Sequence, residues 1–205
     1  GTLARGKRRK VDASVPVPRP GVSLRSKREL EQLHVVLGLP GYPENFSERY
    51  ALFVLNALLG GTLSSRLFQR IREERGLAYS VYSAVNAFRD VGLFLVYAAM
   101  SPSKGNEVIG LILEELRSVR DKGPDAAETA VAKEHLKGSL TLSLESTVSR
   151  MSNLARQEIY YGRQVSPAEM IRGIEAVTPE RVHRLARRLF RSGGVGLAAV
   201  GRTGR

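Results

Sequence analysis

Cysteine is absent from this 205-residue sequence. Without thiols the chain can form no disulfide, no cysteine nucleophile and no cysteine-ligated zinc site, and both the cytoplasm and the periplasm are compatible with it. Long apolar runs are also missing, because none approaches the ~20 residues that a membrane-spanning helix needs. The first five residues, Gly1 to Arg5, contain neither an initiator Met nor the apolar core of a signal peptide. We therefore expect no membrane span and interpret Gly1 as the cut end of a longer protein.

Histidine is scarce, and the three residues, His34, His135 and His183, lie far apart in the sequence. A catalytic zinc ion commonly needs three protein ligands, often with two histidines one helical turn apart. The segment from Val131 to His135 has the frame of a His-x-x-Glu-His helix, but valine occupies the first ligand position. The sequence therefore predicts no metal site in this chain and no complete catalytic set.

Acidic residues are outnumbered, since 32 Lys/Arg against 20 Asp/Glu give a formal net charge of +12. The surplus lies at the two ends: residues 1–30 hold nine basic and two acidic residues, and residues 181–205 hold seven arginines and no acid. The intervening residues 31–180 are slightly acidic. A nucleic-acid-binding protein usually concentrates basic residues on a folded face, often with aromatic residues. The charge pattern therefore favours a solvated linker and tail, with no nucleic-acid partner.

Hydrophobic residues make up 42% of the chain, which is enough for a core, and the length suits one domain. Residues 1–20 form a basic leader in which prolines alternate from Val15 to Pro20. Alternating prolines favour an extended, semi-rigid backbone. We predict a basic, proline-rich linker over residues 1–20 and one domain over residues 21–205.

Hydrophobic periodicity predicts strands and helices in both halves of this domain. Strands are expected in two runs between Val22 and Leu39 with a turn at Arg25–Arg28, in a hairpin over residues 77–100, and over residues 195–200. Helices are expected after a cap at Asn45 or Ser47, and over residues 102–122, 125–144, 146–161, 167–176 and 179–190. This order indicates an α+β fold in which helices cover an antiparallel or mixed β-sheet.

The stretch from Leu59 to Tyr82 lies between the first expected helix and the hairpin. Leu63, Leu67 and Ile71 recur every four residues and predict one apolar helical face, and Gly76 predicts a left-handed helix stop. From Leu77 a period of two places Leu77, Tyr79 and Val81 on one face of the next strand.

Arg72 in the last helical turn and Tyr79 on the strand are thereby expected to lie close together. One interpretation is structural, with an arginine at the negative end of the helix dipole and a half-buried tyrosine. The other is functional, because both side chains can donate hydrogen bonds to a substrate carbonyl, and one such donor contributes ~3 kcal/mol to catalysis. The residues alone favour the structural interpretation.

The segment Leu59–Ser83 resembles the hallmark of the C-terminal domain in the insulinase/pitrilysin family of zinc metallopeptidases, which includes the mitochondrial processing peptidases. The residues that carry the resemblance read Leu-Gly-Gly-x-x-Ser-Ser-Arg-Leu-Phe-x-x-Ile-Arg-Glu-x-Arg-Gly-Leu-Ala-Tyr-Ser-Val-Tyr-Ser. Further segments agree in the same order: Glu29–Gly38, Leu136–Leu140, Ser149–Ala155 and Val177–Glu180. The resemblance spans about residues 22–200.

This resemblance implies one half of a clamshell of two similar α+β domains that close over a peptide. In the family, the first domain holds zinc through His-x-x-Glu-His, and the second lacks the metal site. The second domain contributes an Arg and a Tyr seven residues apart to the cleft, which correspond to Arg72 and Tyr79. Gly60 and Gly61 would lie in the substrate-cleft loop.

The implied function is the C-terminal, non-metal-binding half of a zinc-dependent metalloendopeptidase. Its implied partners are an N-terminal zinc-binding domain or subunit and a peptide substrate, with zinc on that partner and no cofactor in this chain. The chain alone should be inactive, and a homo-oligomer is also compatible with the family. One alternative is a non-catalytic scaffold, as in the core subunits of the respiratory ubiquinol–cytochrome c reductase, which resemble this family. The other is a nucleic-acid binder that uses the net charge of +12, which steep salt dependence of polynucleotide binding would support.

Overall fold

A five-stranded β-sheet organises the structure, a computed structural model that describes residues 20–191 and 194–202. The predicted linker therefore lies outside the described residues, apart from Pro20. The strands follow the order β1-β5-β2-β4-β3. Their bounds are β1 (Val22–Ser26), β2 (Leu33–Gly41), β3 (Ala78–Ala87), β4 (Gly92–Met100) and β5 (Gly196–Gly201).

The last strand of the chain lies inside the sheet and not at its edge. β5 pairs in parallel with β1 and antiparallel with β2, so the sheet is mixed. The two strands expected in succession after Val22 are therefore separated by β5. The turn expected at Arg25–Arg28 lies later, because Arg25 and Ser26 still pair with Val200 and Gly201. The predicted hairpin is confirmed as β3 and β4, which pair antiparallel.

Six α-helices and three short helical turns complete the described part of the chain. The helices are α1 (Arg49–Asn56), α2 (Gly105–Lys122), α3 (Ala126–Ser143), α4 (Thr147–Tyr161), α5 (Pro167–Glu175) and α6 (Pro179–Leu189). The turns are the π-helical η1 (Ala57–Gly61) and η2 (Phe68–Glu73) and the 3-10 turn η3 (Pro102–Lys104). None of the described helices is long and apolar enough to cross a membrane.

Most helix starts lie where their capping residues indicate. Ser166 and Thr178 accept hydrogen bonds from backbone N–H groups of the first turns of α5 and α6, each of which begins with proline. The cap expected at Asn45 or Ser47 is wrong, because α1 begins after Glu48 without a side-chain cap. Tight turns at Pro43–Phe46 and Phe46–Arg49 occupy the backbone before that point and delay the helix.

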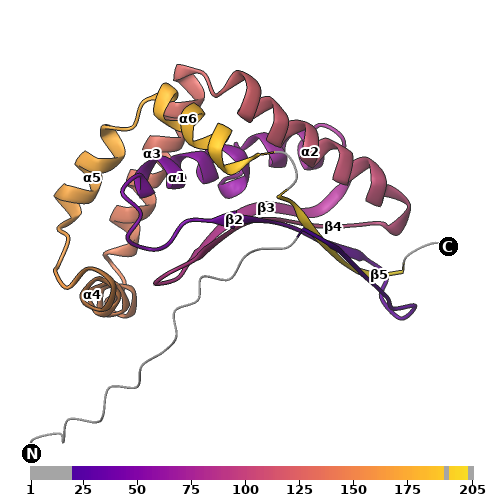
Figure 1. The fold of residues 1–205 in the computed structure, drawn as a ribbon, viewed down its shortest axis with the longest axis horizontal. Helices are drawn as coiled ribbons and strands as arrows, with labels where there is room; N and C mark the ends of the chain where they lie inside the picture. The colour runs from indigo at the N-terminus through magenta and orange to yellow at the C-terminus, as the bar shows by residue number, and fades with distance from the viewer. Residues whose placement is uncertain (1–19, 192–193, 203–205) are drawn as a thin grey trace, which may run out of the picture.

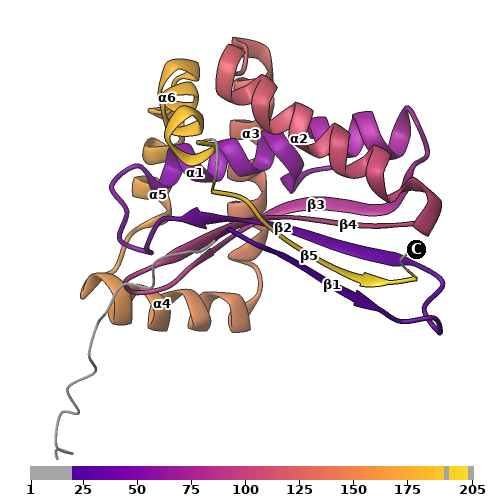
Figure 2. The same ribbon diagram turned by 45° about the vertical axis from the view of Figure 1, so that its right-hand side comes forward.

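The helices lie mainly on one side of the sheet (Figure 1). α1, α2 and α6 pack over that face, and α3 and α5 pack against α1. α4 stands apart, below the other helices in both views (Figure 2). The core forms between the sheet and this layer, and β2 shows its pattern: Leu33, Val35, Leu37 and Leu39 are buried, whereas the residues between them are not. Alternation therefore divides the sheet into a helix-covered face and an open face.

Candidate functional site

Tyr79 lies at a β-bulge near the start of β3. The register pairs Ala78 with Met100 and Ser80 with Ala99, so Tyr79 is the extra residue of its strand. Ala78 and Val81 are both buried, whereas the side chain of Tyr79 is 62% exposed. The alternation that placed Tyr79 on the same face as Val81 is wrong, because a bulge adds one residue and re-aims the side chain. The bulge therefore accounts for the exposure of Tyr79.

Arg72 lies in η2, the turn that precedes β3. Its guanidinium carbon lies 5.0 Å from the centroid of the Phe68 ring, and the side chain is exposed. Gly76 has a φ of +59°, as expected for the helix stop, and the Leu77 N–H then donates to the Ile71 carbonyl at 2.9 Å. Among the described residues, no hydrogen bond or ring contact joins Arg72 to Tyr79. The expected closeness of the two side chains therefore stays a prediction.

The apolar helical face expected before Arg72 is only partly formed. Leu67 and Ile71 are fully buried, but Leu63 is 72% exposed. The Ser65 N–H and hydroxyl both donate to the Thr62 carbonyl, at 3.2 and 2.6 Å, which closes a tight turn before the helical segment begins. Leu63 lies inside this turn and is therefore not part of the helical face.

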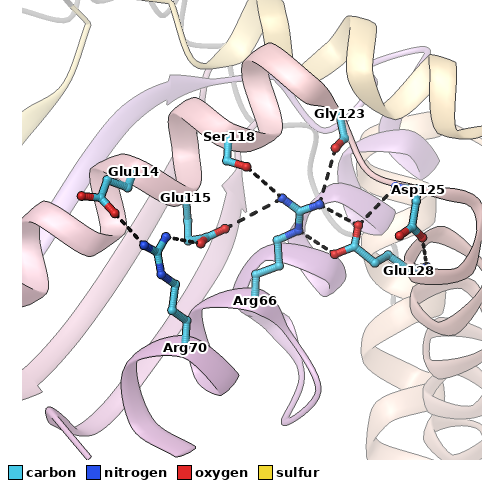
Figure 3. Close-up of polar contacts among 8 residues, drawn as sticks. All are labelled: Arg66, Arg70, Glu114, Glu115, Ser118, Gly123, Asp125 and Glu128. Atoms are coloured by element: carbon cyan, nitrogen blue, oxygen red, sulfur yellow. Dashed lines mark hydrogen bonds and ion pairs between the residues drawn. The ribbon is translucent and has the colours of Figure 1, made fainter. Parts of the chain in front are cut away.

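A guanidinium at the centre of a polar network holds this helical segment in place (Figure 3). Arg66 donates to both carboxylate oxygens of Glu128, at 2.7 and 2.6 Å, and to Ser118 Oγ and the Gly123 carbonyl, each at 3.5 Å. The hydrogen bonds to Glu128, together with the charges of Glu128, Glu115 and Asp125, raise the pKa of the Arg66 guanidinium above its ordinary value, although burial opposes the shift. Arg66 thus joins the segment to the end of α2 and the start of α3.

Glu128 also belongs to the capping box of α3. Its backbone N–H donates to Asp125 Oδ1 at 2.7 Å, and its carboxylate accepts from the Asp125 N–H at 3.2 Å. A capping box satisfies two backbone donors that the first helical turn leaves free. The same carboxylate therefore caps a helix and binds Arg66.

Arg70 forms a second set of ion pairs, one helical turn after Arg66. Its guanidinium donates to Glu115 at 2.5 Å and to Glu114 at 2.6 Å, both on α2. Glu115 is buried and also lies 3.8 Å from Arg66. The hydrogen bond to Glu115 is the main cause that raises the pKa of Arg70.

The sequence interpretation did not single out Arg66, Arg70, Glu115 or Glu128. The available signal was that Arg66 and Arg70 are four residues apart, next to the apolar Leu67 and Ile71. Arg66 and Arg70 therefore share one side of a segment that must be partly buried.

Gly60 and Gly61 lie at the end of η1 and not in an open loop. Gly60 is buried, and a Cβ at this position would lie 2.5 Å from the backbone nitrogen of Ser83. The Ser83 hydroxyl in turn donates to the Asn56 side chain at 2.9 Å. Gly60 thus allows η1 to approach β3 closely, whereas Gly61 is exposed. Contact of either residue with substrate stays a prediction.

No group of three or more metal-ligating side chains occurs among residues 20–191 and 194–202. The three histidines each lie in a different setting. His34 Nδ1 lies 2.8 Å from the Tyr97 hydroxyl, His135 Nε2 lies 3.3 Å from Ser139 Oγ, and His183 Nε2 lies 3.0 Å from the Arg120 carbonyl. The side chains in this part of the chain therefore do not fit a zinc site.

Comparisons with known proteins identify one family of peptidases. A family model described as the peptidase M16 inactive domain matches residues 1–136. An uncharacterized zinc protease of Mycobacterium bovis is 47% identical over 174 residues, which cover 85% of this chain and 40% of that protein. The uncharacterized zinc protease YmxG of Bacillus subtilis is 42% identical over 167 residues, which cover 82% of this chain and 41% of that protein. The chain thus spans less than half of these relatives.

Solved structures show the same fold. The crystal structure of a peptidase M16 inactive domain from Pseudomonas fluorescens superposes with a TM-score of 0.82 at 22% identity, over 91% of this chain and 45% of that chain. A chain of complex III2 from Candida albicans superposes with a TM-score of 0.79 at 20% identity, over 88% of this chain and 45% of that chain. At these identities the likeness concerns the α+β architecture.

Proposed function

We propose that this chain, which belongs to the family of peptidase M16 inactive domains, is the C-terminal, non-metal-binding half of a zinc-dependent metalloendopeptidase. It would close over a peptide together with a domain that carries His-x-x-Glu-His. The family name and the zinc-protease names of the relatives support this function. The described side chains do not fit a metal, so zinc would belong to the partner domain, and the contribution of this chain is to bind and orient the peptide.

The single observation that carries the proposal is that Arg72, unlike the arginines near it in the sequence, is not paired with a carboxylate among the described residues. Arg66 and Arg70 each have close carboxylate partners, and Arg75 lies 3.9 Å from Glu107. Arg72 lies between them in the sequence, is exposed, and has no carboxylate partner among the described residues. Its guanidinium therefore keeps its hydrogen-bond donors available to a ligand.

The Tyr79 hydroxyl is available in the same way. It is exposed at a bulge and has no hydrogen-bond partner in the part of the chain that the structure describes. Two free donors, one of them charged, can hold the carbonyl oxygen of a bound peptide and stabilise negative charge that develops on it. Arg72 and Tyr79 are thus proposed as the substrate-contacting residues.

Reconstitution with the catalytic half tests this function. The chain alone should neither cleave peptides nor bind zinc tightly, and mixing it with the purified His-x-x-Glu-His half should give cleavage of a fluorogenic peptide. Arg72→Ala and Tyr79→Phe should each lower kcat of the mixture by about 10². Arg117→Ala, at an exposed arginine of α2, is the matched control and should retain wild-type turnover.

The alternative scaffold function gives a different result in the same experiment. A non-catalytic scaffold would bind the other half without giving cleavage, and its binding would not depend on Arg72 or Tyr79. Wild-type kcat in both variants would contradict the roles assigned to these residues, and a stable but inactive mixture would favour the scaffold.

A further inference from the structure

A cavity of about 290 Å³ lies between α1, α4, α5 and the far end of β3. It shares no lining residue with the proposed substrate-contacting pair. Its apolar lining includes Phe53, Val85 and Met170. This volume is at the lower end of the range for small-molecule sites, so the cavity suits a ligand of about amino-acid size.

Arg49 lines this cavity and contacts two aromatic rings. Its guanidinium carbon lies 4.8 Å from the ring centroids of both Tyr50 and Tyr161, and Nη2 donates to the Tyr50 hydroxyl at 3.1 Å. Cation–π contacts with both rings restrict the orientation of the guanidinium. No carboxylate pairs with Arg49 in the described residues. A half-buried guanidinium of restricted orientation thus keeps most of its five N–H donors unused.

The one carboxylate in the cavity lining is bound by other groups. Glu44 accepts from Arg156 at 2.6 Å and from the Tyr161 hydroxyl at 2.9 Å. Two arginines and one glutamate therefore line the cavity, so the lining itself carries one positive charge in excess. Glu169, outside the lining, is a further carboxylate that interacts electrostatically with Arg49. An anionic ligand would supply the balancing negative charge.

A neutral donor lies in the same lining. The side-chain amide of Asn153 on α4 lines the cavity, and it has no hydrogen-bond partner in the described residues. Gln157 on the same helix uses its amide oxygen within the fold, since Oε1 accepts from the Val165 N–H at 2.7 Å. The guanidinium of Arg49 and the amide of Asn153 therefore have donors to spare in this cavity, and neither is paired with a carboxylate, whereas Arg156 is bound to Glu44.

We propose that this cavity binds an organic carboxylate with an apolar body. The carboxylate would accept charge-assisted hydrogen bonds from Arg49 and a hydrogen bond from Asn153, and the apolar body would lie against Phe53, Val85 and Met170. Such a ligand is either a free small acid or the C-terminal residue of a peptide. The site does not depend on the proposed peptidase function, because none of its residues belongs to the Arg72 segment or to the bulge at Tyr79.

A titration of the 205-residue chain with N-acetylleucine, followed by NMR chemical shifts, tests the site. N-acetylleucine amide has the same apolar body without the charge, and it should bind about tenfold or more weakly, the loss expected for a charged hydrogen bond. Arg49→Met should weaken binding of the acid by a similar factor and leave the amide unchanged. Arg117→Met, remote from this lining, should bind the acid like the wild type.

Equal affinity for the acid and the amide, or wild-type affinity in the Arg49→Met variant, would overturn the proposal. If Arg49→Met disturbs the packing of Tyr50 and Tyr161 and thereby the fold, Asn153→Ala provides the second test, because it removes a donor and leaves Arg49 and both tyrosines in place. An Asn153→Ala chain that binds the acid with unchanged affinity would also count against the site.

A blocked tetrapeptide that ends in leucine with a free carboxylate separates the two sources. Binding as tight as that of N-acetylleucine would support the site and assign it to peptide C-termini. Binding of the acid without binding of the peptide would support it as a site for free acids. Failure of both ligands would overturn it, while reconstituted cleavage would be unaffected.

Discussion

The guanidinium of Arg66 and the carboxylate of Glu128 form a fork-to-fork pair, with Nε to Oε1 at 2.7 Å and Nη2 to Oε2 at 2.6 Å. The pair joins residues 62 positions apart in the sequence, and it connects the segment that carries Arg72 to the first turn of α3 (Figure 3). Paired hydrogen bonds of this kind fix direction as well as distance. The position of the proposed substrate-contacting residues therefore depends on a pair that does not itself contact substrate.

Breaking this pair should destabilise the fold. In the wild type, Glu128 and Glu115 share Arg66 as a positively charged partner, and Arg66→Met removes it. We expect this substitution to lower the free energy of unfolding by about 2–4 kcal/mol. Urea unfolding followed by circular dichroism measures the change. Arg163→Met is the control, because the Arg163–Glu169 pair has similar geometry but is exposed, and its loss should cost less than about 1 kcal/mol. Equal losses in the two variants would contradict a structural role for Arg66.

Gly60 should tolerate no side chain. In Gly60→Ala the new Cβ would lie 2.5 Å from the Ser83 nitrogen and 2.8 Å from Ser83 Oγ, so η1 and β3 must separate. We expect a loss of about 1–3 kcal/mol in the free energy of unfolding. Gly138→Ala is the matched control, since Gly138 lies in α3 with no atom within 4 Å of its added Cβ, and it should gain about 0.5–1 kcal/mol. A neutral Gly60→Ala variant would contradict the close approach.

Local signals in the sequence were sufficient for most elements. The Ser-Pro and Thr-Pro starts of α5 and α6, the glycine that ends α4 at Gly162, and the hairpin of β3 and β4 depend on residues near one another in the chain. Capping, left-handed glycines and alternation act over one or two turns. Sequence reasoning therefore placed these elements correctly.

Features that depend on distant residues were not accessible in the same way. β5 pairs with β1 across the whole length of the domain, and nothing in the short run after Gly194 specifies a central position in the sheet. The bulge at Tyr79 depends on the register with β4, and the Arg66–Glu128 pair depends on how α3 docks. Arg72 and Tyr79 were thus identified by the family resemblance, whereas the bulge that exposes Tyr79 required the structure.

Two tyrosine-to-phenylalanine substitutions should separate a functional hydroxyl from a structural one. Tyr79→Phe removes an exposed hydroxyl without a described partner, and it should change the free energy of unfolding by less than about 0.5 kcal/mol. Tyr161→Phe removes a hydroxyl that donates to Glu44 at 2.9 Å, and it should cost about 1–2 kcal/mol. Urea unfolding measures both. A large loss in Tyr79→Phe would mean that reduced turnover in that variant reports on folding and not on substrate contact.

The hydroxyl of Tyr161 should titrate well above the ordinary pKa of a tyrosine. Burial, followed by the hydrogen bond to Glu44 and the charge of that carboxylate, raises the pKa of Tyr161 to about 12 from an ordinary value of about 10. Tyrosinate absorbance during an alkaline titration, compared with that of Tyr161→Phe, isolates this group. Glu44→Gln should lower the pKa of Tyr161 but leave it above 10, because burial is the largest cause. Titration of wild-type Tyr161 near pH 10 would contradict the burial of its hydroxyl beside Glu44.

The same shift predicts the sign of a stability change with pH. Because the folded state holds the Tyr161 proton more tightly than the unfolded chain, loss of that proton favours unfolding. The stabilising contribution is fully present below about pH 10 and is lost as the pH rises from about 10 to about 12. Over this window the free energy of unfolding should fall less steeply in Glu44→Gln and Tyr161→Phe than in the wild type. Parallel slopes in all three proteins would show that Tyr161 does not couple its titration to the fold.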